Sequence, residues 1–319
     1  MQYLDNATLA SLMDWPGLVG ALESAFIAGL EAPVRIQQEI PRSSGSDITL
    51  LTMPAHRSGH RFGIKCATVS PDNVRLDLPG VHAIYVLFDG DTGQPLATLE
   101  ADRLTAWRTA AASALASRYL SREDASHLLV LGTGRMARTL IEAHTAVRPI
   151  ETVSVWGRNS AKAHRLVEEF RDRPFEIFTT ESLSDSVPTA DIVSCATMAK
   201  ESLFDGDWLS PGTHVDLVGA FRPDMRECDD TTMRRAEVHV DTMEGCLEEA
   251  GDLLASLKSG AIAHGDIRGT LDELCRHEVS GRRSPEDITL FKSVGTAIED
   301  LAAADWFLDR HKLSQRKAS

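Results

Sequence analysis

A glycine-rich turn in the middle of the chain has the residue types and spacing of an anion-binding site. The apolar residues 128–131 run directly into Gly132, Thr133, Gly134, Arg135, Met136 and Ala137. In a Gly-x-Gly-x-x-Ala pattern after a buried strand, the glycines let the backbone approach a pyrophosphate, and the following helix offers it free N–H groups. We therefore expect a bound dinucleotide at this turn. An ordinary strand, turn and helix is the alternative, because the motif alone is a weak signal.

The end of the next predicted strand bears on which nicotinamide cofactor would bind. NAD-binding proteins usually have an acidic residue there, which accepts a hydrogen bond from the ribose 2′-hydroxyl. Residues 152–156 are instead followed by Gly157, Arg158 and Asn159. Gly157 leaves room, and the Arg158 guanidinium, with Asn159 beside it, suits a 2′-phosphate. This favours NADP(H) over NAD(H); otherwise Arg158 is a solvated loop residue.

Arg108 is a charged residue in an alanine-rich segment that should be buried. On a helix over residues 103–120 it shares a stripe with Leu104, Ala111 and Leu115. A buried charge is costly unless it is paired, and no acid lies three or four residues away along the chain. The balancing charge is either an anionic ligand, such as a substrate carboxylate or a cofactor phosphate, or an acid from elsewhere in the fold.

Lys65 and Arg35 are two further basic residues in strand-like segments. Lys65 lies in the mostly apolar run 62–67. If its side chain points inward, desolvation lowers its pKa and makes it a usable acid; if it points outward, it is an ordinary surface lysine. Spacing does not decide between the two. Arg35, in residues 32–36, is by itself typical of a surface strand.

Composition is typical of a globular enzyme and argues against several other classes. Of the 319 residues, 43% are hydrophobic and 25% are charged, and the net charge of −14 with no basic block argues against a nucleic-acid partner. We find no apolar run long enough for a membrane span and no signal-peptide pattern. The five cysteines have no paired spacing and no His/Cys cluster has metal-ligand spacing. We therefore expect a cytoplasmic protein without a metal or a membrane partner.

The order of the predicted elements indicates two domains. The first 125 residues contain a helix after Asp14, the 103–120 helix and mostly antiparallel strand signals, at 34–40, 48–53, 62–69, 83–88 and 96–99. From residue 126 strands and helices alternate, as in a doubly wound parallel sheet, with strand-like runs at 128–131, 152–156, 190–197, 214–219 and 237–241. A helical tail from 295 to about 308 returns to the first domain. We predict an α/β protein with a Rossmann domain (126–290) inserted into a discontinuous α+β domain (1–125 plus 291–319).

Several short motifs, taken in order, resemble the ornithine cyclodeaminase/mu-crystallin family over nearly the whole chain. The matching segments are Pro33-Val34-Arg35, Gly63-Ile64-Lys65, Arg108-Thr109-Ala110-Ala111, Leu131-Gly132-Thr133-Gly134, Val218-Gly219-Ala220, Arg222-Pro223-Asp224 and Phe291-Lys292-Ser293-Val294-Gly295. The resemblance implies a Rossmann domain that binds NAD(P) and a second domain that binds substrate and forms the interface of a homodimer. It also implies a small amino or imino acid as the substrate.

The resemblance further assigns roles to particular residues. It implies that Arg35 and Arg108 hold the substrate carboxylate, and that Lys65 also lines the substrate site and is the catalytic residue in proton transfer. Val294 matches a substrate contact. The residues that match cofactor-binding positions are Gly132, Thr133 and Gly134, then Arg135 and Met136 at the pyrophosphate, and Thr197, Asp216, Leu217, Val218, Gly219 and Ser293 on the nicotinamide side.

Three departures from the ornithine cyclodeaminases bear on the reaction. Phe221 stands where those enzymes have an aspartate that handles the amino group, Ala83 follows His82 in place of a threonine, and Gly157 replaces the NAD-selecting acid. We therefore predict an NADP-dependent oxidoreductase that reduces a C=N bond beside a carboxylate, either a ketimine or cyclic imino acid reductase or an amino acid dehydrogenase. The alternatives are an ornithine cyclodeaminase, an ammonia lyase giving proline, and a non-catalytic, NADPH-binding mu-crystallin-like protein.

Overall fold

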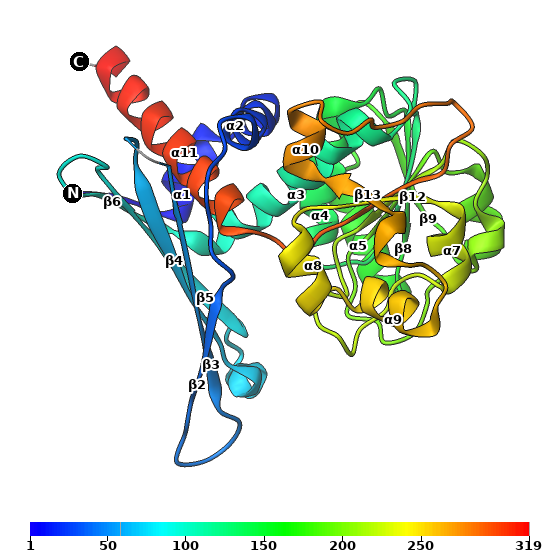
Figure 1. The fold of residues 1–319 in the computed structure, drawn as a ribbon, viewed down its shortest axis with the longest axis horizontal. Helices are drawn as coiled ribbons and strands as arrows, with labels where there is room; N and C mark the ends of the chain where they lie inside the picture. The colour runs from blue at the N-terminus through cyan, green and yellow to red at the C-terminus, as the bar shows by residue number, and fades with distance from the viewer. Residues whose placement is uncertain (58, 319) are drawn as a thin grey trace. The chain divides into compact units, whose positions relative to one another are not determined.

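The computed structural model describes residues 1–57 and 59–318, which form two compact units (Figure 1). The first unit consists of residues 1–108 and 296–318, and the second unit of residues 109–295. From the sequence we predicted domain boundaries after residues 125 and 290. One observed division falls inside helix α3 (Ala101–Leu120). The other follows β14 (Thr289–Lys292), because that strand belongs to the sheet of the second unit.

The first unit is built on a six-stranded sheet with the order β1-β6-β5-β4-β3-β2. Strands β2 to β6 pair antiparallel, and β1 pairs parallel with β6. The strands are β1 (Gln2–Leu4), β2 (Ile36–Ile40), β3 (Ile48–His56), β4 (Phe62–Val69), β5 (Val81–Phe88) and β6 (Pro95–Glu100). The helices are α1 (Asn6–Leu12), α2 (Trp15–Ile27), the start of α3 and α11 (Ala297–Ala318), with a 3-10 turn at Pro71–Leu76.

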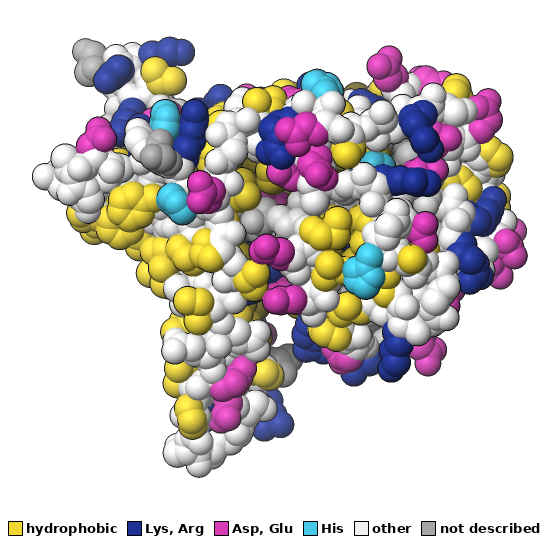
Figure 2. Space-filling model, viewed as in Figure 1, with side chains coloured by type: hydrophobic (Ala, Val, Ile, Leu, Met, Phe, Trp, Pro, Cys, Tyr) yellow, Lys and Arg dark blue, Asp and Glu magenta, His cyan; other side chains and the backbone are white. Residues whose placement is uncertain are grey.

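The two faces of this sheet differ in what covers them. Helix α11 contacts β3, β4 and β5, and alternate residues of β4, among them Gly63 and Lys65, are buried on that inner face. The outer face carries apolar side chains that stay accessible, including Ile36 on β2 and Ile84 on β5. In Figure 2, hydrophobic side chains gather along this sheet. The inner face therefore forms the core of the unit, and the outer face is an apolar surface.

The second unit contains an eight-stranded, all-parallel sheet with the order β13-β12-β14-β11-β10-β7-β8-β9. Its strands, besides β14, are β7 (His127–Leu131), β8 (Thr152–Trp156), β9 (Glu176–Thr179), β10 (Ile192–Cys195), β11 (His214–Leu217), β12 (Glu237–Val240) and β13 (Ile267–Thr270). The chain runs outward from β7 through β8 to β9 and returns to β10 on the other side of β7. Such a reversal creates a crevice at the carboxyl ends of the strands, where α/β proteins bind ligands.

Helices and apolar clusters cover both faces of the parallel sheet. Leu129 and Leu131 of β7 belong to one buried cluster, and Leu128 and Val130 to another, as strand alternation requires. The helices are α4 (Arg135–Val147), α5 (Ser160–Glu169), α6 (Leu183–Ser186), α7 (Asp230–Arg235), α8 (Met243–Glu249), α9 (Gly251–Ser259) and α10 (Leu271–Cys275). Three 3-10 turns lie at Val187–Thr189, Gly206–Trp208 and His264–Asp266. No helix in the described part of the chain is long and apolar enough to cross a membrane.

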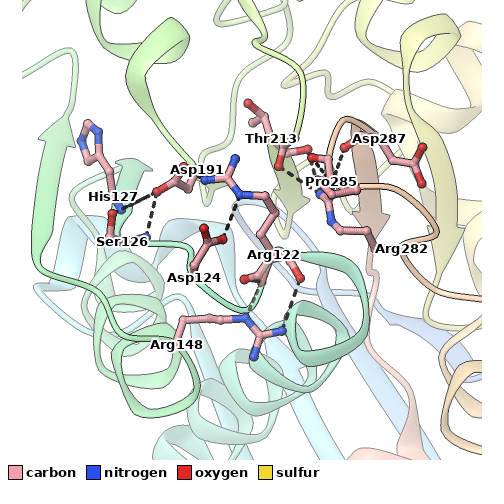
Figure 3. Close-up of polar contacts among 12 residues, drawn as sticks. Arg122, Asp124, Ser126, His127, Arg148, Asp191, Thr213, Arg282, Pro285 and Asp287 are labelled. Carbon is pink, nitrogen blue, oxygen red and sulfur yellow. Dashed lines mark hydrogen bonds and ion pairs between the residues drawn. The ribbon is translucent and has the colours of Figure 1, made fainter.

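Arginine side chains anchor the carboxyl end of α3 within the second unit, and Figure 3 labels two of them, Arg148 and Arg282, among the polar contacts that it draws. Arg148 donates to the Ser117 carbonyl and to Oγ of Ser121, both at 2.8 Å, and Arg282 donates to the Leu120 carbonyl at 2.8 Å. The last carbonyls of a helix lack partners within the helix and attract cations. These bonds therefore stabilise the end of the helix whose other half carries Arg108.

Candidate active site

Lys65 and Arg108 lie together in the first unit and share one carboxylate. Lys65, on β4, places Nζ 2.6 Å from Oδ2 of Asp300 on α11. Arg108, on α3, donates through Nε to Oδ1 of the same Asp300 at 2.9 Å and through Nη1 to Glu299. Lys65 and Arg108 are 3% and 4% exposed. Two cations and two carboxylates are thus buried in direct contact, from three elements of the fold.

This arrangement decides between the alternatives that the sequence left open. The side chain of Lys65 points inward. Arg108 has partner acids from elsewhere in the fold, so an unpaired buried charge is no longer an argument for an anionic ligand. Glu299 and Asp300 follow Arg108 by about 190 residues, which is why a search three or four residues away missed them. The visible signal was a pair of acids beside the apolar Ile298 and Leu301 of a predicted helix.

The surroundings of Lys65 make it a weaker base than an exposed lysine. Its pKa is lowered to about 8, chiefly by burial, with Arg108 and Arg35 acting in the same direction and Asp300 opposing the shift. For Asp300, burial opposes ionisation, but Arg108 and Lys65 outweigh it and lower its pKa. Arg35 lies half-buried immediately before β2. With both acids ionised and Lys65 protonated, the four buried charges cancel and Arg35 adds one positive charge, which suits a monoanionic ligand.

In the second unit the predicted cofactor residues follow the carboxyl ends of five adjacent strands. These strands, in sheet order β8, β7, β10, β11 and β14, are neighbours. The strand order reverses between β7 and β10. The residues concerned are Arg158 and Asn159 after β8, Gly132 to Met136 after β7, Thr197 after β10, Asp216 to Gly219 at the end of β11, and Ser293 and Val294 after β14. The topology therefore brings residues from separate motifs to one edge of the sheet.

The glycine turn after β7 has the backbone that a pyrophosphate site requires. Gly132 has φ of 136°, and a Cβ there would meet the Ala196 carbonyl oxygen at 2.7 Å. Gly134 is the N-cap of α4, makes no side-chain cap hydrogen bond, and would have open space around an added Cβ. Arg135 and Met136 form the first turn of the helix. The N-cap of α4 thus supplies no side-chain acceptor, and the turn fits a dinucleotide phosphate.

The turn after β8 is closely packed against the glycine turn. A Cβ at Gly157 would collide with Cγ2 of Thr133. The Arg158 side chain is exposed. Asn159 caps α5, because its Oδ1 accepts from the Lys162 N–H at 3.1 Å. Gly157 is therefore required by the close approach of Thr133, while Arg158 is the accessible cation at this position.

On the nicotinamide side the predicted residues are held by buried groups. Asp216 is fully buried and accepts from Oγ of Ser194 at 2.6 Å, with Nε2 of His144 at 3.2 Å. The Asp216 side chain is therefore held within the sheet and is not accessible to a ligand. Leu217 and Val218 are also buried. Oγ of Ser293 is buried and has no hydrogen-bond partner among the described residues.

The structure also shows site residues to which the sequence gave no role. The Val294 N–H donates to Asp241 at 2.8 Å, so Asp241 fixes the segment after β14. Thr197 donates to Glu227 through both its N–H and its hydroxyl. Lys292 is buried beside Asp252. Because these acids lie far from their partners in the sequence, only the fold could reveal the pairing.

The fold and site define a dinucleotide-binding protein of the Rossmann type with a separate cluster of buried charges. The model of the ornithine cyclodeaminase/mu-crystallin family matches residues 9–315, and the chain belongs to this family. A Delta(1)-pyrroline-2-carboxylate reductase from Colwellia psychrerythraea is 40% identical over 92% of this chain and 93% of the relative.

Two solved structures are similar over nearly all of both chains. The Delta(1)-pyrroline-2-carboxylate reductase of Thermococcus litoralis, in complex with NADH and L-proline, is 34% identical, with a TM-score of 0.92 over 99% of this chain and 98% of that chain. An archaeal alanine dehydrogenase dimer with bound NAD is 27% identical, with a TM-score of 0.91 over 99% of this chain and 97% of that chain.

Proposed function

We propose that this protein is an NAD(P)-dependent oxidoreductase that reduces the C=N bond of a ketimine or cyclic imino acid next to its carboxylate. The observation that carries the proposal is the buried cluster of Lys65, Arg108 and Asp300, in a chain that belongs to a family with imino acid reductases among its members. The cluster combines a cation that can bind a carboxylate with an ammonium whose pKa is about 8. Phe221, in place of the acid that handles the amino group in ornithine cyclodeaminases, favours reduction over ammonia loss.

Each basic residue has a separate role in this mechanism. Arg108 and Arg35 hold the substrate carboxylate; we assign Nη2 of Arg108 to this contact, because Nε and Nη1 are engaged by Asp300 and Glu299. Lys65 donates a proton to the imine nitrogen. A bound reduced nicotinamide supplies the hydride. The carbon gains the hydride and the nitrogen gains the proton, so C=N becomes CH–NH and Lys65 is left as a neutral amine that Asp300 keeps in place.

The dinucleotide would be held by the second unit. The first turn of α4 would bind the pyrophosphate through its N–H groups, and the ends of β10, β11 and β14 would face the nicotinamide side. Val294, which follows β14, remains a proposed substrate contact. We further propose that NADP(H) is preferred over NAD(H), because no acid follows β8 and the Arg158 guanidinium is accessible there.

A homodimer and a cytoplasmic location are the remaining parts of the proposal. The outer face of the six-stranded sheet is apolar and matches what a second copy of the chain would bury. All five cysteines carry free thiols, as is usual in a reducing compartment. Neither part is needed for the chemistry.

The direct test is a turnover assay with NADPH and Delta(1)-pyrroline-2-carboxylate. We expect loss of reduced-nicotinamide absorbance and formation of proline, and we expect Lys65→Met to abolish turnover while it still binds NADPH. Ammonia and proline formed from ornithine with no net change in cofactor would favour the lyase instead. Tight NADPH binding with no turnover across a panel of imino and oxo acids would favour the non-catalytic alternative.

A further inference from the structure

Three buried charged residues in the second unit have no role in the proposed chemistry. Glu227, Asp252 and Lys292 are all fully buried. Nζ of Lys292 lies 3.4 Å from Oδ2 of Asp252. One ammonium thus accompanies two carboxyl groups. Burying ions is costly unless the geometry repays it, and apolar residues of similar size often give equal or better stability. The three residues need a further reason to be there.

Two of the three contact backbone turns at the carboxyl edge of the parallel sheet, and the third contacts them through Glu227. Oε1 of Glu227 accepts from the N–H and the hydroxyl of Thr197, at 2.6 and 2.8 Å. Lys292 donates to the Leu217 carbonyl at 3.2 Å and to the Gly219 carbonyl. Asp252 reaches the same place indirectly, because its Oδ1 accepts from the N–H of Glu227 at 2.6 Å.

Gly219 and Glu227 also occupy adjoining space. A Cβ at Gly219 would collide with Oε1 of Glu227 and with the Thr197 carbonyl oxygen. The turn after β10 and the turn after β11 are therefore packed against one carboxylate, and neither can move without displacing it. Oε2 of Glu227 has no hydrogen-bond partner among the described residues. An unpaired buried oxygen costs stability, so this site is not optimised for stability alone.

We infer that Glu227 is a positioning residue that, together with Lys292 and Asp252, holds Thr197 and Gly219 in the shape that the nicotinamide half of the dinucleotide requires. This inference rests on the proposed function, since that proposal places the cofactor at these two turns. Glu227 acts through Thr197 and Gly219 and has no contact with the reacting atoms. Its effect is on cofactor affinity rather than on proton transfer.

The test compares cofactor affinity with stability in variants of the full-length protein. Glu227→Leu fills similar space but removes the acceptor; we expect the dissociation constant for NADPH, measured by calorimetry well below the unfolding midpoint of the variant, to rise at least about 10-fold. The midpoint itself should also fall, because the Thr197 N–H and hydroxyl lose their acceptor. Glu227→Gln keeps an acceptor oxygen for Thr197 and should restore most of the affinity. As a control, Thr213→Val removes a buried hydroxyl that is bonded to the Ala190 carbonyl at 3.2 Å, immediately before β11 at the amino edge of the sheet, and should leave NADPH affinity unchanged.

The outcomes separate this inference from the proposed function. If the unaltered protein binds neither NADPH nor NADH, the proposed function fails. If it binds and Glu227→Leu binds equally well, only the inference is overturned. Should Glu227→Leu not fold, hydrogen exchange on the unaltered protein decides: NADPH should slow exchange in peptides covering 196–199 and 217–220. An absence of that protection, with NADPH bound, would contradict the inference.

Discussion

At the scale of single residues, Asp300 is the group on which the proposed chemistry depends. One of its oxygens pairs with Lys65 and the other with Arg108. The proton donor and the carboxylate-binding cation are thus fixed relative to each other by a single side chain. Because Asp300 is on α11 and its partners are on β4 and α3, the spacing of the two cations is set by tertiary packing rather than by local sequence.

The pH dependence of turnover should report the pKa of Lys65. That pKa is lowered to about 8, so the ammonium form is present below pH 8 and is lost as the pH rises through 8. Imine reduction, which uses the ammonium, should fall about tenfold per pH unit above this value. Oxidation of the cyclic amino acid uses the neutral amine and should rise over the same range. Steady-state kcat/KM profiles in both directions measure the effect.

Asp300 provides the control for this assignment. Its charge raises the pKa of Lys65, so Asp300→Asn should move the fall in reduction to lower pH. Lys200→Met removes an exposed lysine paired with Asp224 and should leave the profile unchanged. A profile that does not respond to Asp300→Asn would show that another group titrates.

The cofactor preference should reside in Arg158. If its guanidinium binds the 2′-phosphate, Arg158→Ala should weaken NADPH binding roughly 10-fold or more and leave NADH binding nearly unchanged, because only NADPH carries that phosphate. Titration of both cofactors, followed by fluorescence, measures the ratio. Arg165→Ala, at an exposed position of α5, is the matched control. An equal loss for both cofactors would assign Arg158 to the structure of the loop.

At the scale of elements, the sequence predicted those strands whose pattern is regular. The run 62–69 coincides with β4, and 128–131 and 152–156 lie on β7 and β8. Strand β1 was missed because it has three residues and is stabilised only by pairing with β6. Strand β14 was not identified because its apolar run includes Lys292. The charge of Lys292 is buried beside Asp252, which belongs to a helix distant in the sequence.

The candidate site was also predictable only in part from the sequence. Lys65 and Arg108 could be found because a charge within an apolar pattern is conspicuous. Their pairing with Glu299 and Asp300 could not be predicted, because contacts between residues so far apart in the sequence depend on the packing of α11 against the sheet. The turns after the strands were predictable from glycine spacing, whereas the buried Glu227 behind them was not.

The buried histidine of β11 should make the protein sensitive to acid. Nδ1 of His214 lies 3.0 Å from Oγ1 of Thr289, whose own proton goes to the Leu120 carbonyl, so the ring donates from Nδ1. Burial lowers the pKa of His214 to about 3. The unfolded chain takes up the proton near pH 6.5, so stability is lost as the pH falls from 6.5 towards 3.

Urea unfolding at pH 7 and pH 5 measures this loss. His214 should account for about 2 kcal/mol of the decrease in the free energy of unfolding at pH 5, because that pH lies roughly 1.5 units below the unfolded pKa. His214→Asn should lower the free energy of unfolding at both pH values, but it should reduce the difference between them by about 2 kcal/mol. His264→Asn, at an exposed position, should leave that difference unchanged. An unchanged pH dependence in His214→Asn would place the acid sensitivity elsewhere.

At the scale of the whole molecule, the proposed substrate-binding and cofactor-binding residues belong to different units. The basic residues for the substrate belong to the first unit, and the glycine turn and the strand ends for the cofactor belong to the second. Helix α3 contributes to both, since Arg108 lies in its first half and its last carbonyls accept from Arg148 and Arg282. A change at the carboxyl end of α3 therefore acts on the same helix that presents Arg108.

The outer face of the six-stranded sheet should be the surface that joins two copies of the chain. A sheet with helices on one face and apolar side chains on the other buries only half of its hydrophobic area until something covers the second face. Ile84 lies on this face and is 48% exposed, whereas Ile27, which is 52% exposed, lies on α2 outside it.

Light scattering after size exclusion should give a dimer for the unaltered protein and for Ile27→Asp. Ile84→Asp should be mostly monomeric, because a carboxylate buried without a partner costs about 3 kcal/mol, or roughly 100-fold in the dissociation constant. A monomeric unaltered protein, or equal disruption by both variants, would rule out this face as the interface.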